Sequence, residues 1–444
     1  MRFWVGGYSS DMDGTAEGIG LLTAGEDGSP FASGPLSFRG AVRPALTSPS
    51  WLAAHPSLDV VYAALEGEGR VSALARTGDT SFAALGPSVE AGEAVCHVAV
   101  SPDGTYLLAS CWGDGRIVRI GLDGNGRPMD RVVAPAARDP YGIDRGDPRD
   151  AAREDLDEPE DPRAARERRE ERMSGVAADQ DAERRRSEIG LADAAAALRA
   201  DAAAALRAAA GAEFAHLIPD HDRPAEPDLR GATLLTSAVD ADAASRTSRA
   251  HAAAFLPDGR ALTTDLGFDV VRVWCRASGR MVPDHEVLLP RGSGPRHLLV
   301  HPSGYVYVLT EHSAEVFILG ADRAGQWRVR GSIPAAALTL PDDAGAELAA
   351  SHDRAFLYAG LRGSDTIAVL RVAGDGGSLE QVALAESGVT WPRHHLVVRD
   401  TLLVAGQHSN DVASLSLDIR TGVPSKVRHR AGVPAPTRIL RARD

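Results

Sequence analysis

VCHVAVSPDGTYLLASCWGDGRIVRI, residues 95–120, decides the fold because variants of it recur along the chain. It holds a short alternating apolar run, a turn rich in Ser, Pro, Asp and Gly, a second apolar run, a polar turn and a third run. Five further copies are SPSWLAAHPSLDVVYAALEGEGRVSAL from Ser48, RAHAAAFLPDGRALTTDLGFDVVRVW from Arg249, GPRHLLVHPSGYVYVLTEHSAEVFIL from Gly294, AELAASHDRAFLYAGLRGSDTIAVLRV from Ala346 and WPRHHLVVRDTLLVAGQHSNDVASLSL from Trp391. A period of about 45 residues with three to four strands per unit is typical of a β-propeller blade.

A seventh blade can be assembled from the two ends of the chain. Residues 2–8 and GIGLLTA from Gly18 read as strands, and PAPTRILRA from Pro434 supplies a further short apolar run. Pairing the termini in one sheet closes the ring and leaves no exposed sheet edge. The sequence therefore predicts an all-β fold, a single seven-bladed β-propeller over residues 1–444 closed by its N- and C-terminal strands.

One interval breaks the period. The second and third copies are separated by far more residues than one blade needs, and much of the excess falls in residues 145–212. This stretch begins with a mixed-charge run and continues as an Ala-rich segment with high helix propensity. We expect a charged, helical or partly disordered insertion. A lid over the site and an oligomerisation arm are the alternatives.

Charge and cysteine content limit the class of protein. The net charge is −13 and no basic patch is visible, which argues against a nucleic-acid partner but not against an anionic substrate. Three cysteines form no disulfide framework and favour a reducing compartment. No signal peptide and no apolar run of about 18 residues is present, so we expect a cytoplasmic protein without a membrane partner. The oligomeric state stays open.

Polar side chains recur at two positions of the copies. The first position opens the innermost apolar run and holds His97, His251, Arg296, His297 and Arg393. The second follows the next run and holds Glu66, Asp265, Glu311, Arg362 and Gln407. Because loops at one end of a propeller surround its axis, superposed blades would bring these side chains together.

Such a cluster suits an anionic ester-like substrate. Arg presents a planar fork that matches carboxylate or phosphate, and a neighbouring His or Glu can act as a general base toward water. No Ser lies in a nucleophile-elbow motif, which disfavours an acyl-enzyme. The histidines form no spaced metal-ligand motif, so no metal or other cofactor is predicted.

Several of these residues also have structural interpretations. His97 is equally typical of a hydrogen-bonded structural histidine, and Asp265 of a carboxylate that ties a turn. Glu311 could be a solvated strand end, and the guanidinium groups of Arg362 and Arg393 could bind carbonyl groups of neighbouring blades.

GPRH with its downstream Glu, and DLGFD, are the most specific of the repeated words. Together with HVAVSPDGTYLLAS, LRGSDTIAVL and GQHSNDVASLSLDIRTG they resemble the lactonase family of seven-bladed propellers, which includes 6-phosphogluconolactonases of the cycloisomerase type and fungal carboxy-cis,cis-muconate cyclases. The resemblance covers nearly the whole chain outside the insertion. It implies that His251, Arg296, Glu311 and Arg362 are catalytic, and we expect His97, His297, Arg393 and Gln407 to bind substrate.

The chain departs from the family pattern beside these residues. Arg249 stands where a His-x-His pair begins, and Thr310, Leu361 and Gly406 replace Asn residues that precede the functional Glu, Arg and Gln. The Asn-Tyr pair that the family has near the end of the second repeat is replaced around Ser110 and Cys111. The leading hypothesis is a hydrolase of carbohydrate metabolism that opens an anionic sugar lactone, 6-phosphogluconolactone or a relative. The alternatives are a muconate-type lactonising cycloisomerase and a non-catalytic ligand- or protein-binding propeller.

Overall fold

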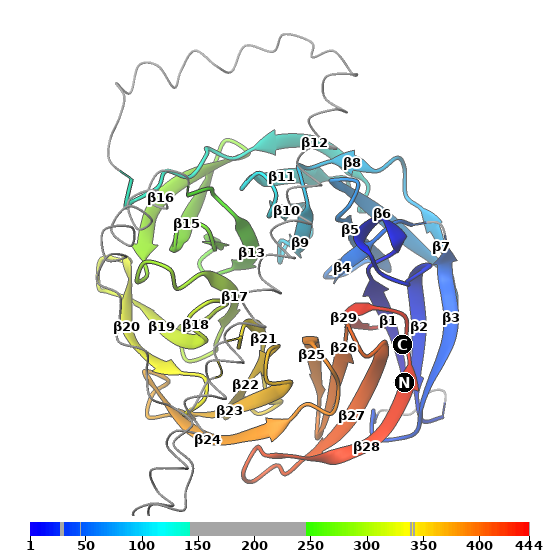
Figure 1. Cartoon of the computed structure of the whole chain (residues 1–444). Helices are drawn as coiled ribbons and strands as arrows, with labels where there is room; N and C mark the ends of the chain where they lie inside the picture. The colour runs from blue at the N-terminus through cyan, green and yellow to red at the C-terminus, as the bar shows by residue number, and fades with distance from the viewer. Residues whose placement is uncertain (27–30, 45, 143–245, 338–339, 341, 444) are drawn as a thin grey trace, which may run out of the picture. The chain divides into compact units, whose positions relative to one another are not determined.

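The described part of the chain folds into seven antiparallel sheets arranged around one axis (Figure 1). The computed structural model describes residues 1–26, 31–44, 46–142, 246–337, 340 and 342–443. These residues form one compact unit, Met1–Tyr141 with Arg246–Asp444. The predicted insertion 145–212 belongs to the second unit, Gly142–Ser245, and lies outside the described residues.

Each sheet has four strands in order from the axis outward. The first four sheets are β29 (Pro436–Arg441), β1 (Arg2–Gly7), β2 (Gly18–Ala24) and β3 (Leu36–Pro44); β4 (Pro49–Ala54), β5 (Val60–Leu65), β6 (Arg70–Gly78) and β7 (Ser81–Ala84); β9 (Val95–Val100), β10 (Tyr106–Cys111), β11 (Ile117–Leu122) and β12 (Pro128–Val133); and β13 (Ala250–Phe255), β14 (Ala261–Asp265), β15 (Val270–Ala277) and β16 (Arg280–Leu288). The other three are β17 (Pro295–Val300), β18 (Val306–Thr310), β19 (Glu315–Ala321) and β20 (Trp327–Pro334); β21 (Gly345–Ala350), β22 (Phe356–Leu361), β23 (Thr366–Ala373) and β24 (Ser378–Glu386); and β25 (Pro392–Val398), β26 (Thr401–Gly406), β27 (Asp411–Leu417) and β28 (Pro424–Gly432). A short strand β8 (Val89–Glu90) adds to β6, and a 3-10 helix η1 spans Ser10–Met12.

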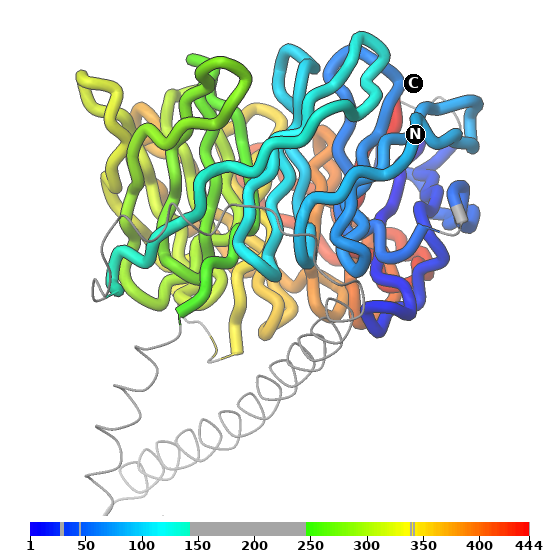
Figure 2. Tube along the Cα trace, turned by 90° about the horizontal axis from the view of Figure 1, so that it is seen from above, coloured from blue at the N-terminus to red at the C-terminus, as the bar shows by residue number. Residues whose placement is uncertain are grey.

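The termini close the ring as predicted. Strand β29 pairs with β1, which places Trp4 opposite Leu440, and β1 pairs with β2 in the same sheet. The two ends of the chain therefore lie side by side (Figures 1 and 2). This sheet is the seventh blade, and the prediction of an all-β, seven-bladed propeller is confirmed.

The hydrophobic core lies between neighbouring sheets. The middle strands are buried on both faces, as in the run YLLASC of β10, because each sheet is covered by the next one on either side. Among the described residues, seven apolar clusters fill the seven junctions between adjacent sheets. The cluster of Phe3, Leu403 and Ile439 joins the last blade to the first, so closure of the ring is stabilised by burial as well as by strand pairing.

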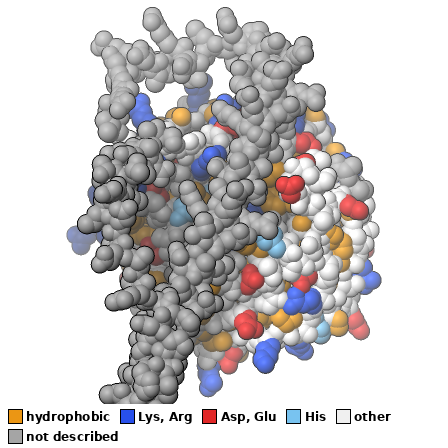
Figure 3. Space-filling model, in the orientation of Figure 1, with side chains coloured by type: hydrophobic (Ala, Val, Ile, Leu, Met, Phe, Trp, Pro, Cys, Tyr) orange, Lys and Arg blue, Asp and Glu red, His pale blue; other side chains and the backbone are white. Residues whose placement is uncertain are grey.

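The outer strands face solvent. Strand β16 exposes most of its residues and buries Met281 and Val287, which is the alternation expected at a half-buried edge. On the face seen in Figure 3, acidic and basic side chains of the described residues are mixed rather than separated by sign. No helix in the described ranges is both long and apolar enough to span a bilayer.

All seven innermost strands carry a β-bulge at the same place. In β17, Pro295 is opposite Thr310 and His297 is opposite Leu309, so Arg296 is an extra residue without a partner. The same register shift occurs in β4, β9, β13, β21, β25 and β29. A bulge redirects a side chain relative to regular alternation, so the second and third residues of each inner strand form two separate layers near the axis.

Candidate active site

We call the first layer the mouth tier. It comprises the bulged second residue of each inner strand and the residue that follows the adjacent strand of the same sheet. The bulged residues are Ser50, Cys96, His251, Arg296, Ala346, Arg393 and Thr437, and the residues after the adjacent strand are Tyr8, Glu66, Trp112, Leu266, Glu311, Arg362 and Gln407. Two clusters of charge form within this tier.

The first cluster is built around Glu311. Its Oε2 atom lies 2.7 Å from Arg296 Nε and 2.9 Å from Arg362 Nη2. Arg296 is also held by the backbone, because its Nη1 donates to the carbonyl oxygen of Ala346 at 2.6 Å. Both arginines are nearly fully buried, so this carboxylate fixes two guanidinium groups side by side.

The charges of this cluster stay ionised near neutral pH. Burial acts to raise the pKa of Glu311, but Arg362 and Arg296 outweigh it and lower the pKa to about 2. Burial, with repulsion from Arg362, lowers the pKa of Arg296 to about 10. The result is two cations sharing one anion, a net positive site for an anionic ligand.

The second cluster is built around Glu66. Tyr8 Oη lies 3.1 Å from Glu66 Oε2 and 3.2 Å from Oε1, and Arg393 Nη2 donates to the same Tyr8 oxygen at 2.5 Å. The phenol therefore stands between the guanidinium and the carboxyl group. Burial raises the pKa of Glu66 above its usual range, with Arg393 opposing this shift. Burial likewise raises the pKa of Tyr8.

His251 belongs to the mouth tier and keeps a free ring nitrogen. Its side chain is buried, and its Nδ1 atom has no hydrogen-bond partner among the described residues. Burial, reinforced by the charge of Arg296, lowers the pKa of His251 well below its usual value. The imidazole is therefore neutral and able to accept a proton.

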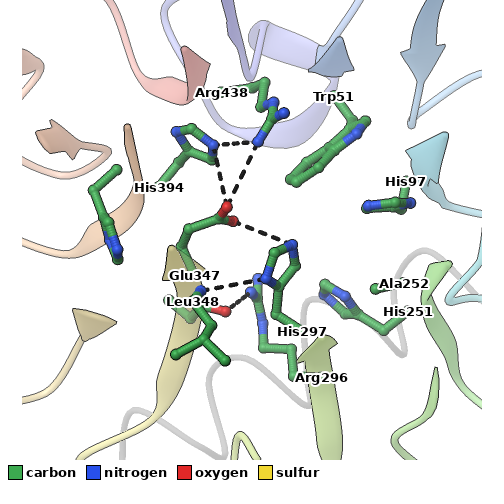
Figure 4. Close-up of polar contacts among 12 residues, drawn as sticks. Trp51, His97, His251, Ala252, Arg296, His297, Glu347, Leu348, His394 and Arg438 are labelled. Carbon is green, nitrogen blue, oxygen red and sulfur yellow. Dashed lines mark hydrogen bonds and ion pairs between the residues drawn. The ribbon is translucent and has the colours of Figure 1, made fainter. Parts of the chain in front are cut away.

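The second layer, which we call the axial ring, consists of the third residues of the inner strands (Figure 4). These residues are Trp51, His97, Ala252, His297, Glu347, His394 and Arg438. Glu347 lies 3.5 Å from His297 Nε2, 3.5 Å from His394 Nε2 and 3.7 Å from Arg438 Nη1. Arg438 stacks on Trp51 at 3.9 Å from the ring centroid and contacts His394. Burial raises the pKa of Glu347 to about 7, against the opposing charge of Arg438.

The axial ring also ties neighbouring blades together. The Nδ1 atoms of His97, His297 and His394 accept backbone N–H groups of Ala253, Leu348 and Ile439, each at the fourth position of the next inner strand. Trp51 Nε1 donates to the carbonyl oxygen of Val98, and Arg438 Nε to that of Leu52, at the same position of the following blade. Five of the seven residues of this ring therefore bond the backbone of the next blade.

The structure separates the predicted site residues into these two layers. His251, Arg296, Glu311 and Arg362, predicted as catalytic, all lie in the mouth tier, as do Arg393 and Gln407. His97 and His297, predicted to bind substrate, lie in the axial ring. The bulge explains the division, because it places adjacent residues such as Arg296 and His297 in different layers.

Asp265 does not belong to the second repeated position, contrary to the sequence alignment of the blades. It pairs with Ala250 and so corresponds to Thr310, while Leu266 holds the place equivalent to Glu311. Its carboxylate accepts the backbone N–H groups of Arg249 and Phe268 at 2.8 and 3.1 Å. Asp265 therefore ties its turn, which was the structural interpretation of this residue.

The residues that depart from the family pattern stabilise the same rim in other ways. Thr310 Oγ1 accepts the N–H of Glu315 and pairs with Ser313, which holds the turn that begins with Glu311. Arg249 donates to the carbonyl oxygens of Trp112 and Gly113 in the preceding blade. Leu361 is buried in the core and Gly406 pairs with Pro392, so neither offers a polar side chain there.

Sequence reasoning missed several polar residues of the two layers, and Tyr8, Arg438 and Glu347 are examples. Tyr8 lies in the N-terminal strand region, whose copy of the repeat is split between the chain ends. Arg438 lies in β29 for the same reason. Glu347 stands in AELAA, where its place is equivalent to His297, and aligning the inner strands residue by residue could have found it.

Metal-binding groups and surface grooves among the described residues are the remaining features that bear on the site. Among the described residues, no group of three or more His, Cys, Asp or Glu side chains is arranged to hold a metal ion. A groove lined by Gly7, Phe38 and Val433 contains none of the predicted site residues, and the same is true of one lined by Trp4 and Phe82.

Comparison with known proteins places this geometry in context. The family model described as lactonase, 7-bladed beta-propeller, matches residues 2–146 and 225–441. A 6-phosphogluconolactonase of Bacillus subtilis is 29% identical over 196 residues, which cover 42% of this chain and 55% of that protein. An uncharacterised protein of Lactococcus lactis is 30% identical over 186 residues, covering 40% and 53%. The chain thus spans about half the length of the curated relatives it matches.

Solved structures share the fold at low sequence identity. A protein from Lactobacillus plantarum superposes with a TM-score of 0.66 at 18% identity, covering 99% of this chain and 98% of that one. A periplasmic gluconolactonase of Pseudomonas aeruginosa superposes with a TM-score of 0.64 at 18% identity, covering all of both chains.

Proposed function

The chain belongs to the lactonase family of seven-bladed β-propellers, and from this premise we propose that it hydrolyses an anionic sugar lactone, 6-phosphogluconolactone or a relative. The observation that carries the proposal is the Glu311 cluster. Two buried arginines share one carboxylate oxygen, and a buried histidine with a free ring nitrogen lies in the same tier. Cations and a neutral base at these positions suit direct attack by water.

In the proposed reaction the arginines act on the substrate's charges. Arg296 and Arg362 bind the anionic group or the lactone carbonyl oxygen, where negative charge develops as water adds. Glu311 holds both guanidinium groups in place, so little reorganisation is needed when the substrate enters. Arg393 and Gln407 complete the binding surface, since the Oε1 atom of Gln407 has no partner among the described residues.

His251 is the better candidate for the base. Without substrate both groups are weak proton acceptors, because the pKa of Glu311 is lowered to about 2 and that of His251 well below its usual value. Glu311 is bound by two arginines, whereas Nδ1 of His251 has no hydrogen-bond partner among the described residues. An anionic substrate would offset the charge of Arg296 and so raise the pKa of His251 toward working pH. Substrate binding would thereby activate the base.

A lactone panel tests the proposed function. The purified full-length protein is mixed with 6-phosphogluconolactone, uncharged gluconolactone and a carboxylated lactone, and acid release is followed by pH-stat. We expect acceleration above spontaneous hydrolysis, greatest for an anionic lactone, and none with an Arg296→Ala variant purified in the same way. Spontaneous rates throughout the panel would refute the lactonase proposal. Consumption of a carboxymuconate, seen as lost ultraviolet absorbance, would favour the cycloisomerase instead.

We also propose that the protein works in the cytoplasm. All three cysteines are free thiols, with Cys96 and Cys111 buried and Cys275 partly buried, which fits a reducing compartment. Fractionation of the native host with an antibody to the protein would test this location.

A further inference from the structure

Two buried carboxyl groups occupy equivalent places in the mouth tier but have opposite surroundings. Glu66 and Glu311 each follow the second strand of their blade, after Leu65 and Thr310. Glu311 touches two guanidinium groups directly. Glu66 accepts a hydrogen bond from the hydroxyl group of Tyr8, and Arg393 donates to that same Tyr8 oxygen.

The difference in contacts predicts a difference in protonation. A direct ion pair favours the charged carboxylate, whereas burial without a direct ion pair favours the acid form of a carboxyl group. Glu66 is 7% exposed, so water does little to solvate its charge. The groups that face it are Tyr8, Ser50, Arg393, Arg296 and Cys96. Burial raises the pKa of Glu66, although the two arginines and the hydroxyl groups of Tyr8 and Ser50 act to lower it. The thiol and phenol are both neutral near pH 7 because burial raises the pKa of each.

The two carboxyl groups act on a common space. Arg296, which pairs with Glu311, also acts electrostatically on Glu66, and Arg393, which contacts Tyr8, is influenced by Glu311. One small molecule bound by these arginines would therefore lie between the two clusters. Pairs of acids whose environments separate their pKa values are the usual basis for assigning distinct roles in a reaction.

We propose that Glu66 is a catalytic residue of the lactonase, the acid that donates a proton to the ring oxygen as the lactone opens. Tyr8 is a positioning residue that holds the carboxyl group and keeps Arg393 from pairing with it directly. The inference rests on the proposed function, because it assigns a role within that reaction.

Every proton moved in the proposed reaction is accounted for over one turnover. Water attacks the carbonyl carbon, His251 takes a proton from it, and the carbonyl oxygen becomes an oxyanion beside the arginines. The bond between the carbonyl carbon and the ring oxygen then breaks, and the ring oxygen takes the proton of Glu66 to become a hydroxyl group. His251 returns its proton through solvent to Glu66, and the product acid releases one proton to solvent.

Infrared difference spectra test the protonation state without any substrate. Wild type minus Glu66→Gln at pH 7 should show the carbonyl stretch of a protonated carboxylic acid, shifted in heavy water. Wild type minus Glu311→Gln should show the bands of a carboxylate. A carboxylate spectrum for Glu66 would overturn the proposal whether or not the protein hydrolyses any lactone.

Kinetics on the best lactone of the panel test the role. Glu66→Gln should lower kcat by about 10²- to 10⁴-fold with little change in KM, and should abolish the alkaline fall of the wild-type pH profile. Glu66→Asp should keep a weakened rate and that alkaline fall, since it retains an acid. The matched control is Glu68→Gln in the same turn, where the side chain is exposed, and its kcat should equal that of wild type.

Each result separates the two proposals. Wild type without activity on every lactone refutes the proposed function, and the infrared spectra still report on Glu66. Wild type with activity and an unchanged Glu66→Gln variant leaves the lactonase intact and refutes the role of Glu66. If Glu66→Gln does not fold, an unchanged kcat in Glu66→Asp refutes it equally.

Discussion

The mouth tier and the axial ring are made by adjacent residues of the same strands, yet their side chains are satisfied in different ways. In the axial ring, His97, His297 and His394 each accept a backbone N–H group from the next blade. In the mouth tier, the histidine at the bulge, His251, has no partner for Nδ1 among the described residues. Side chains tied to backbone hold the ring together, whereas side chains left free can act on a ligand.

We expect the axial ring to contribute mainly to stability and the mouth tier mainly to the proposed reaction. A side chain that accepts a hydrogen bond from the next blade cannot give it up without a loss of stability, because the buried N–H group would be left without an acceptor. The arginines of the mouth tier instead share Glu311 and are balanced by it only in part. Substitutions at matching positions of the two layers should therefore affect different measurements.

Substitutions of His251 and His97 should show the largest difference between the two layers in their effects on rate and stability. His251→Ala removes the proposed base and should lower kcat by about 10²- to 10⁴-fold, with a melting temperature close to that of wild type. His97→Ala leaves the N–H of Ala253 without its acceptor and should lower the free energy of unfolding by about 1–3 kcal/mol, while kcat changes only a few-fold. Lactone hydrolysis and thermal unfolding of both variants measure this, and a large kcat loss in His97→Ala would place both layers in the reaction.

Arg296 and Arg438 form a second matched pair with a smaller expected effect on rate. Arg296→Ala removes one donor to the developing oxyanion and should lower kcat/KM by about 10²- to 10³-fold. Glu311 keeps Arg362 in that variant, although the carbonyl oxygen of Ala346 loses its donor, so the loss of stability should be smaller than in Arg438→Ala. Arg438→Ala leaves Glu347 buried without its cation and uncovers Trp51, which should cost about 3–5 kcal/mol of stability.

Denaturant unfolding and the lactone assay, applied to both the Arg296→Ala and the Arg438→Ala variants, test this second comparison. Equal losses of stability in the two variants would contradict the division between the layers. A stable Arg438→Ala variant with low kcat/KM would instead show that the axial ring contributes to substrate binding.

The repeat in the sequence predicted the ring, its count of blades and its closure, because strand period and apolar alternation depend on local residue order. It also predicted that His251, Arg296, Glu311 and Arg362 would share one end of the axis. The repeat could not predict the bulge. The sequence PRHLLV reads the same whether Arg296 is an extra, unpaired residue or part of a regularly alternating strand. Without the bulge, His97 and Arg296 appear to hold one position.

The misplacement of Asp265 has a similar cause. DLGFD contains two acidic and two apolar residues at the end of a strand, and the sequence alone does not show which of them is the first residue beyond the paired strand. The hydrogen bonds of Asp265 to Arg249 and Phe268 become visible only once the turn is built. Tyr8 and Arg438 were missed because their blade is divided between the two ends of the chain.

Glu347 gives the last of these effects, and it appears in the pH dependence of stability. Burial raises its folded-state pKa to about 7, above the usual value of 4.5, so the folded protein holds this proton more tightly than the unfolded chain does. Its contribution is therefore fully present below about pH 4.5 and is lost as pH rises through about 7, a change of up to roughly 3 kcal/mol. Glu347→Gln cannot ionise, so the free energy of unfolding of this variant relative to wild type should increase between pH 5 and pH 8. Denaturant titrations at both pH values measure that difference, and a difference independent of pH would mean that Glu347 stays ionised beside Arg438 throughout, like Glu311 in the tier above it.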